Sequence, residues 1–142
     1  MNCSPLWGEK NRVYIMTIVD RRTRCFLSWR VVTNRDQWTA QDMVAEAPAQ
    51  QYFSDQYHIY LELHYPQAQH EARPDKRETY SVEAGNSELR HYLARLVRRS
   101  RCFSRCLEAL SAHVKLFVHA WNKRQLYRQQ HPTYPSHLID FV

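Results

Sequence analysis

Val13-Tyr-Ile-Met-Thr-Ile-Val19 is a short, continuous run of apolar and β-branched residues. Such a run is typical of a strand that is buried on both faces, so it predicts the central strand of a sheet. After the polar turn at residues 20–24, residues 25–32 alternate in character, with Leu27 on one side and Ser28 on the other. The two runs therefore predict a β-hairpin.

The following segments alternate between helix and strand signals. Possible caps at residues 33–36 predict a helix that ends before Pro48. Tyr52-Phe-Ser54 then predicts a short strand in parallel order, which ends directly at Asp55. A helical turn follows at residues 57–60, and we expect one more short strand at residues 69–72.

The second half of the chain has a helical pattern. From Val82 onward, apolar residues recur at three- and four-residue spacing between Leu89 and Val97, which predicts a helix with one core-facing stripe. A second helix is expected from about Ser104 to about Arg128, because its apolar residues keep the same spacing.

This order of elements predicts an α/β layered domain with a mixed sheet flanked by helices. We expect residues 1–142 to form a single domain, with a C-terminal tail at residues 129–142. The chain contains only two glycines, which excludes the glycine-rich phosphate loops of Walker and dinucleotide type. It also lacks a secretory signal and an apolar run of about 18 residues, so we expect a cytoplasmic protein with no membrane partner.

The positive charge of the chain is concentrated in its second half. The formal net charge is +6, to which residues 1–72 contribute −1 and residues 73–128 contribute +8. Such asymmetry favours a face that contacts phosphates, because each neutralised phosphate releases counterions. A solvated helical face explains the same pattern about equally well.

Two acidic residues are candidates for metal chemistry. Asp55 follows a predicted strand, and Glu83 begins the basic helix, where Asn86 and Arg90 lie on the same flank at i+3 and i+7. If the two carboxylates converge, they suit Mg²⁺ or Mn²⁺ and phosphoryl transfer on nucleic acid. Spacing alone favours a simpler interpretation, in which Asp55 caps the next helix and Glu83 complements a helix dipole.

Five local strings carry a more specific signal. They are Tyr14-Ile-Met-Thr-Ile-Val-Asp20-Arg-Arg-Thr-Arg24, Phe26-Leu-Ser-Trp29, Ser54-Asp55, Tyr80-Ser-Val-Glu83-Ala-Gly-Asn86-Ser-Glu-Leu89-Arg90 and Arg101-Cys-Phe-Ser-Arg105. Together they resemble the catalytic domain of the insertion element 1 family of transposases, which are Asp-Asp-Glu recombinases. The resemblance extends over most of the chain, from about Gly8 to the C-terminus.

The resemblance implies a ribonuclease-H-like fold, magnesium-dependent cleavage of the ends of a DNA element, and transfer of the new 3′ hydroxyl into target DNA. In that alignment, Asp55 matches the second acidic position and Glu83 the third. Asn86 and Arg90 match the polar residues that follow the glutamate. The resemblance also favours contact with double-stranded DNA, on which these recombinases assemble as multimers, through five arginines: Arg95, Arg98, Arg99, Arg101 and Arg105.

The chain departs from the family pattern at its first acidic position. That aspartate is expected at or before Met1, where no acid occurs, and Pro5 makes residues 2–5 a poor strand. Asp20 aligns with a hairpin-turn aspartate of the family. The upstream zinc-binding and helix-turn-helix region is also missing. We therefore expect a truncated copy with weak or absent catalysis; the alternatives are a non-catalytic DNA-binding remnant and a ribonuclease-H-type nuclease.

Overall fold

The computed structural model describes residues 2–5, 13–74, 79–93 and 107–142. Ten helices and strands lie within these residues. In chain order they are β1 (Asn2–Pro5), β2 (Tyr14–Val19), β3 (Phe26–Val32), α1 (Gln37–Glu46), β4 (Gln51–Ser54), α2 (His58–Leu61), β5 (Gln69–Ala72), α3 (Tyr80–Tyr92), α4 (Leu107–Gln130) and the 3-10 helix η2 (Leu138–Phe141). No helix of the described residues is long and apolar enough to cross a membrane.

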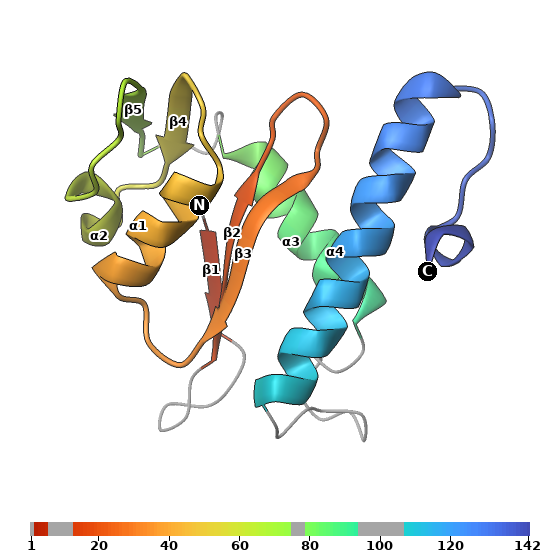
Figure 1. The fold of residues 1–142 in the computed structure, drawn as a ribbon, viewed down its shortest axis with the longest axis horizontal. Helices are drawn as coiled ribbons and strands as arrows, with labels where there is room; N and C mark the ends of the chain where they lie inside the picture. Colours follow the sequence, from red (N-terminus) through yellow and green to blue (C-terminus); the bar gives the residue numbers. More distant parts are fainter. Residues whose placement is uncertain (1, 6–12, 75–78, 94–106) are drawn as a thin grey trace.

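The strands form two small sheets in a mixed α/β arrangement (Figure 1). β2 is the central strand of the first sheet and pairs antiparallel with β1 and with β3. β4 and β5 pair in parallel and form the second sheet. The α/β class, the hairpin, the helix between β3 and β4 and both short strands of the second sheet are therefore confirmed. The prediction of one mixed sheet is wrong for the described strands, because β4 pairs with β5 and with no strand of the first sheet.

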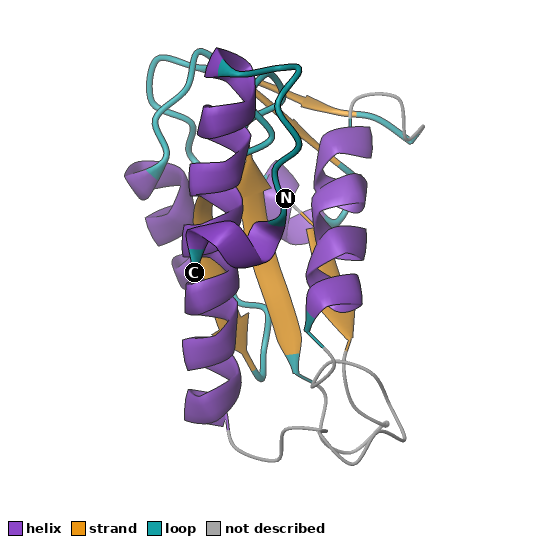
Figure 2. Cartoon of the chain, turned by 90° about the vertical axis from the view of Figure 1, so that its right-hand side faces the viewer, coloured by secondary structure: helices purple, strands orange, loops and turns teal. Residues whose placement is uncertain are grey.

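β2 is buried on both faces, as its sequence predicts. On one face, Val13 and Ile15 join a core cluster with residues of α3 and α4. On the other face, Met16 and Ile18 join a second cluster with residues of α1, α2 and β4. Figure 2 views the domain from the side of α4, which lies in front of the strands. The first sheet is thus a layer between two sets of helices.

The strand at residues 2–5 corrects one expectation. Pro5 was expected to disfavour a strand, yet β1 pairs with β2 from Asn2, opposite Thr17, to Pro5, opposite Tyr14. The reason is positional: Pro5 is the last residue of β1, so its missing N–H removes at most one ladder hydrogen bond.

A β-bulge changes the side-chain alternation predicted for β3. Ile18 pairs with Ser28 but Val19 pairs with Phe26, so Leu27 is an extra residue in β3. Leu27 is 47% exposed, whereas Phe26 is buried in the cluster with α4. The prediction that Leu27 shares the side of the other apolar residues of this strand is therefore wrong, because the bulge shifts the alternation by one residue.

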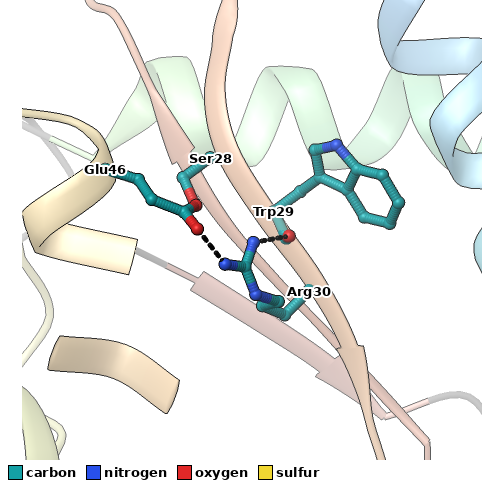
Figure 3. A network of polar contacts seen from close by, with 4 residues as sticks. All are labelled: Ser28, Trp29, Arg30 and Glu46. Atoms are coloured by element: carbon teal, nitrogen blue, oxygen red, sulfur yellow. Dashed lines mark hydrogen bonds and ion pairs between the residues drawn. The ribbon is translucent and has the colours of Figure 1, made fainter. Parts of the chain in front are cut away.

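Polar contacts join the opposite side of β3 to α1 (Figure 3). The guanidinium of Arg30 forms an ion pair with Glu46 and donates to the carbonyl of Trp29 at 2.8 Å, while the Ser28 hydroxyl donates to Glu46 at 2.9 Å. The hydrogen bond from Arg30, followed by that from Ser28, lowers the pKa of Glu46. Because the pair is solvent-exposed, it orients α1 more than it stabilises the domain.

The C-terminal residues fold back on α4. This helix continues to Gln130, and the chain then returns so that Leu138 is buried in the core cluster of α4. The Arg124 guanidinium donates to the carbonyl of Ser136 at 3.0 Å, and Phe141 lies 5.5 Å from the ring of Tyr127. Residues 131–142 therefore belong to the packed domain.

Asp36 caps α1 and provides a first test of the fold. Its carboxylate accepts hydrogen bonds from the Thr39 backbone at 2.8 Å and from the Thr39 hydroxyl at 2.9 Å. These bonds lower the pKa of Asp36 below its ordinary value of 3.8. We expect Asp36→Ala to cost about 1 kcal/mol of unfolding free energy at neutral pH, measured by urea denaturation, and Asp36→Asn to cost much less.

The pH dependence of this cap has a definite sign. Because the folded pKa is depressed, the ionised cap contributes its full stability above the unfolded pKa and loses it as the pH falls through the folded pKa. The difference in unfolding free energy between the original chain and Asp36→Asn should therefore change only at acidic pH, below about 4. A constant difference across that range would show that the carboxylate does not cap the helix.

Candidate functional site

The end of β4 and the start of α3 meet at a cavity of about 140 Å³. Its lining comes from the last residues of β2 and the following turn, from β4 and the residues before it, from the first turn of α3, and from Leu27. Figure 1 places the β2–β3 turn, β4 and the start of α3 at the same end of the molecule. We call this space the β2–β4 cavity.

Asp55 lies at the end of β4, as predicted. It directly follows Ser54, the last residue of the strand, and its side chain is exposed. The carboxylate accepts a hydrogen bond from the backbone N–H of Tyr57 at 3.2 Å, just before α2 begins. This local turn leaves other lone pairs of the carboxylate available to a ligand.

Glu83 lies in the first turn of α3 and is half-buried. A carboxylate in that position is favoured by the positive end of the helix dipole. Val82, the residue before it, lines the β2–β4 cavity, and so does Phe53, two residues before Asp55. Residues next to Asp55 and Glu83 therefore line one cavity, although the two acidic residues are far apart in the sequence and neither of them lines it.

Asn86 and Arg90 have different surroundings on α3. Asn86 is 6% exposed and accepts a hydrogen bond from the Thr17 hydroxyl of β2 at 3.3 Å. Its side-chain amide nitrogen is buried and has no hydrogen-bond partner among the described residues. Arg90, one turn further along, is exposed. Asn86 thus faces the sheet and helps to hold α3 against β2.

Sequence reasoning missed a cluster of arginine and aromatic side chains beside the cavity. The Arg21 guanidinium lies 5.5 Å from the ring centroid of Phe53 and 5.7 Å from that of Tyr80, and Arg24 lies 4.6 Å from Tyr80. A hydrogen bond from Arg21 is the main cause of a lowered pKa of the Tyr80 hydroxyl. The signal available in the sequence is the concentration of arginines in the turn at residues 20–24.

Three hydrogen bonds hold this turn in place. The Asp20 carboxylate accepts hydrogen bonds from the backbone N–H of Thr23, at 2.9 Å, and from its hydroxyl. Partial burial raises the pKa of Asp20, but these hydrogen bonds outweigh it and the pKa is lowered. The Trp121 indole of α4 donates to the carbonyl of Arg24 at 2.9 Å. Asp20 is therefore engaged in hydrogen bonds within the turn.

The five arginines proposed for DNA contact lie outside the described residues; they are Arg95, Arg98, Arg99, Arg101 and Arg105. Within the described part of the chain, no group of three or more His, Cys, Asp or Glu side chains is placed to hold a metal ion. The sequence matches no protein-family model, no curated protein and no solved structure.

Proposed function

We propose that the chain is the catalytic domain of a DNA transposase of the insertion element 1 type, with Asp55 and Glu83 as its metal ligands. The observation that carries the proposal is that β4, which Asp55 directly follows, and α3, whose first turn contains Glu83, both contribute residues to the lining of the β2–β4 cavity. Three antiparallel strands, a helix and two parallel strands also follow one another along the chain in the order expected of a ribonuclease-H-like fold.

The donor chemistry fits a hard divalent cation. Asp55 and Glu83 offer carboxylate oxygens, and protein sites for Mg²⁺ commonly use one or two carboxylates and complete the shell with water and substrate phosphates. When bound, Mg²⁺ or Mn²⁺ would supply Lewis-acid stabilisation of the oxygens of a phosphodiester during displacement. The half-buried Glu83 would be held by α3, which the Thr17–Asn86 hydrogen bond fixes against β2.

The arginines of the β2–β3 turn have a direct role in this proposal. Arg21 and Arg24 lie beside the cavity, and stacking on Phe53 and Tyr80 limits their side-chain motion. Guanidinium groups that are already oriented bind phosphate oxygens at a smaller entropic cost. The turn would therefore position the DNA backbone next to Asp55 and Glu83.

A non-catalytic DNA-binding remnant is the second candidate. It is favoured by the arginines of the β2–β3 turn, whose side chains are oriented by the rings of Phe53 and Tyr80. In this case the arginines of the turn would still hold DNA through its phosphates, and binding would not require a metal.

One pair of measurements tests both candidates. If the chain is the catalytic domain, we expect weak nicking of supercoiled plasmid in Mn²⁺ that is lost in a chelator. We also expect the chain to bind a short fluorescent DNA duplex. Arg21→Ala and Arg24→Ala should each reduce the slope of the logarithm of the association constant against the logarithm of salt concentration by about 1, the contribution of one phosphate contact. Arg128→Ala, at the exposed end of α4, is the matched control. Binding without nicking would select the remnant, and the absence of both would exclude both candidates.

A further inference from the structure

A histidine of the second sheet contacts the last residue of β4. β5 pairs with β4 in a register that sets His70 opposite Tyr52 and Ala72 opposite Ser54. Tyr52 and Ser54 point to the same face of β4, because side chains two residues apart in a strand do so. From its place opposite Tyr52, the His70 ring reaches Ser54, and its Nε2 atom lies 2.8 Å from the hydroxyl oxygen. Ser54 is only 1% exposed, so its hydroxyl is shielded from water.

The Ser54 hydroxyl connects this histidine to Asp55. It donates to the backbone carbonyl of Asp55 at 2.8 Å. A hydroxyl has a single hydrogen to donate, so toward His70 it must accept. We therefore assign the ring proton of His70 to Nε2. The hydrogen bonds then have one direction: His70 donates to Ser54, and Ser54 donates to Asp55.

The ring of His70 is itself held in place. It stacks on the ring of Tyr65, with centroids 4.3 Å apart and planes inclined by 16°. The Tyr65 ring also lies 5.0 Å from that of Tyr52, and its hydroxyl donates to the carbonyl of Tyr60 at 2.8 Å. A donor whose side chain is already ordered loses little conformational entropy when it forms a hydrogen bond. His70 is therefore well suited to orient the end of β4.

Hydrogen bonds restrict the backbone around Asp55 on several sides. The Ser54 hydroxyl holds the Asp55 carbonyl, and the N–H of Tyr57, just before α2, donates to the Asp55 carboxylate at 3.2 Å. The carbonyl of Ser54 accepts from the N–H of Arg73, the residue after β5, at 3.2 Å. The strand end is thus fixed, while the side chain of Asp55 remains exposed.

We propose that His70 is a positioning residue for the divalent metal site: by donating to Ser54, it fixes the backbone at Asp55 and orients the Asp55 carboxylate toward the metal ion. This inference rests on the proposed function, because it requires Asp55 to be a metal ligand. Residues that orient a metal ligand change metal affinity by about 10–100-fold. His70 acts through Ser54 and the backbone, so we expect an effect at the lower end of that range.

Substitutions of His70 separate the hydrogen bond from the ring. His70→Phe keeps a ring against Tyr65 but removes the donor, and it should weaken Mn²⁺ binding about tenfold, measured by the electron paramagnetic resonance signal of free Mn²⁺. His70→Gln loses the ring but carries an amide N–H donor at a similar distance from the backbone, and it should restore the affinity to within about threefold of the original chain. His64→Phe, an exposed histidine between α2 and β5, is the matched control and should leave the affinity unchanged.

Two outcomes of this series would overturn the role of His70. The first is a His70→Phe variant that binds Mn²⁺ as tightly as the original chain. The second is a His70→Gln variant that binds as weakly as His70→Phe, because the lost ring and not the lost hydrogen bond would then be the cause.

Ser54→Ala tests the connection to Asp55. It should weaken Mn²⁺ binding about as much as His70→Phe, and the double variant should bind no more weakly than either single variant, because both substitutions break the same series of hydrogen bonds. Additive losses would contradict the proposal. Circular dichroism verifies that each variant is folded. Ser54→Ala removes a single oxygen atom, so it provides the test by itself if His70→Phe does not fold.

Mn²⁺ binding by the original chain distinguishes this inference from the function on which it rests. If the original chain does not bind Mn²⁺, or if Asp55→Asn leaves the affinity unchanged, the proposed function fails and the role of His70 fails with it. If Mn²⁺ binding depends on Asp55 but not on His70 or Ser54, only the role of His70 is overturned.

Discussion

Replacement of Phe26 by alanine is expected to lower the free energy of unfolding by about 3–5 kcal/mol. Phe26 is 3% exposed and lies where β3 meets both long helices. Its ring makes edge contacts with Phe117 and Trp121 of α4, at centroid distances of 5.9 and 6.5 Å. Removing the ring would leave a cavity that these neighbours, held by their own helix, can close only in part. Urea denaturation measures the change.

A second substitution makes this test specific. Gly85 of α3 lies so close to Phe26 that a Cβ atom there would be 3.1 Å from the ring. Gly85→Ala should therefore add little to the free energy of unfolding of the original chain, because the Phe26 ring must shift to make room. In a Phe26→Leu background the same change should stabilise by about 0.5–1 kcal/mol, the usual preference of a helix interior for alanine. Additive effects of the two substitutions would contradict the predicted contact.

Loss of either proposed metal ligand is the second large effect that we expect. Asp55→Asn or Glu83→Gln should weaken Mn²⁺ binding by at least about 100-fold, because even residues that only orient a ligand change metal affinity by 10–100-fold. The electron paramagnetic resonance signal of free Mn²⁺ gives the affinity directly. This measurement concerns metal binding alone, so it applies even to a copy of the chain that does not cleave DNA.

Matched acidic residues control for the loss of charge. Glu88→Gln changes a carboxylate on the same helix as Glu83, and Asp42→Asn changes an exposed carboxylate of α1. Glu88 lies five residues after Glu83 on α3 and Asp42 lies on another helix, so neither should alter Mn²⁺ affinity beyond a small electrostatic effect. If Asp55→Asn and Glu83→Gln behave like these controls, Asp55 and Glu83 are a turn residue and a helix-terminal residue, as the simpler interpretation of the sequence holds.

Local patterns predicted the elements of this chain better than their mutual arrangement. The continuous run at Val13–Val19 indicated a strand buried on both faces, and the two core clusters on either side of β2 confirm it. The alternation in β3 was wrong at Leu27, because a bulge depends on how β3 pairs with β2 and on its packing against α4. There Asn122 accepts a hydrogen bond from the N–H of Phe26 and donates one to its carbonyl, both at 2.8 Å.

In the candidate site, too, local patterns predicted some positions and tertiary packing decided others. Asp55 and Glu83 were assigned to the end of a strand and the start of a helix from their immediate neighbours, and both positions agree with the structure. The arginines of the β2–β3 turn could not be assigned to the site, since Arg21 contacts Phe53 and Tyr80 only after β2, β4 and α3 have packed.

By itself, the sequence determined the order and type of the elements, the buried strand at the centre and the placement of the acidic residues at element ends. These features follow from the spacing of apolar residues and from caps, which act over a few neighbouring residues. Only the tertiary structure decided that the turn arginines stack beside the cavity and that residues of β2, β4 and α3 line it together. Such features depend on register and packing between segments far apart in the chain, which no local pattern encodes.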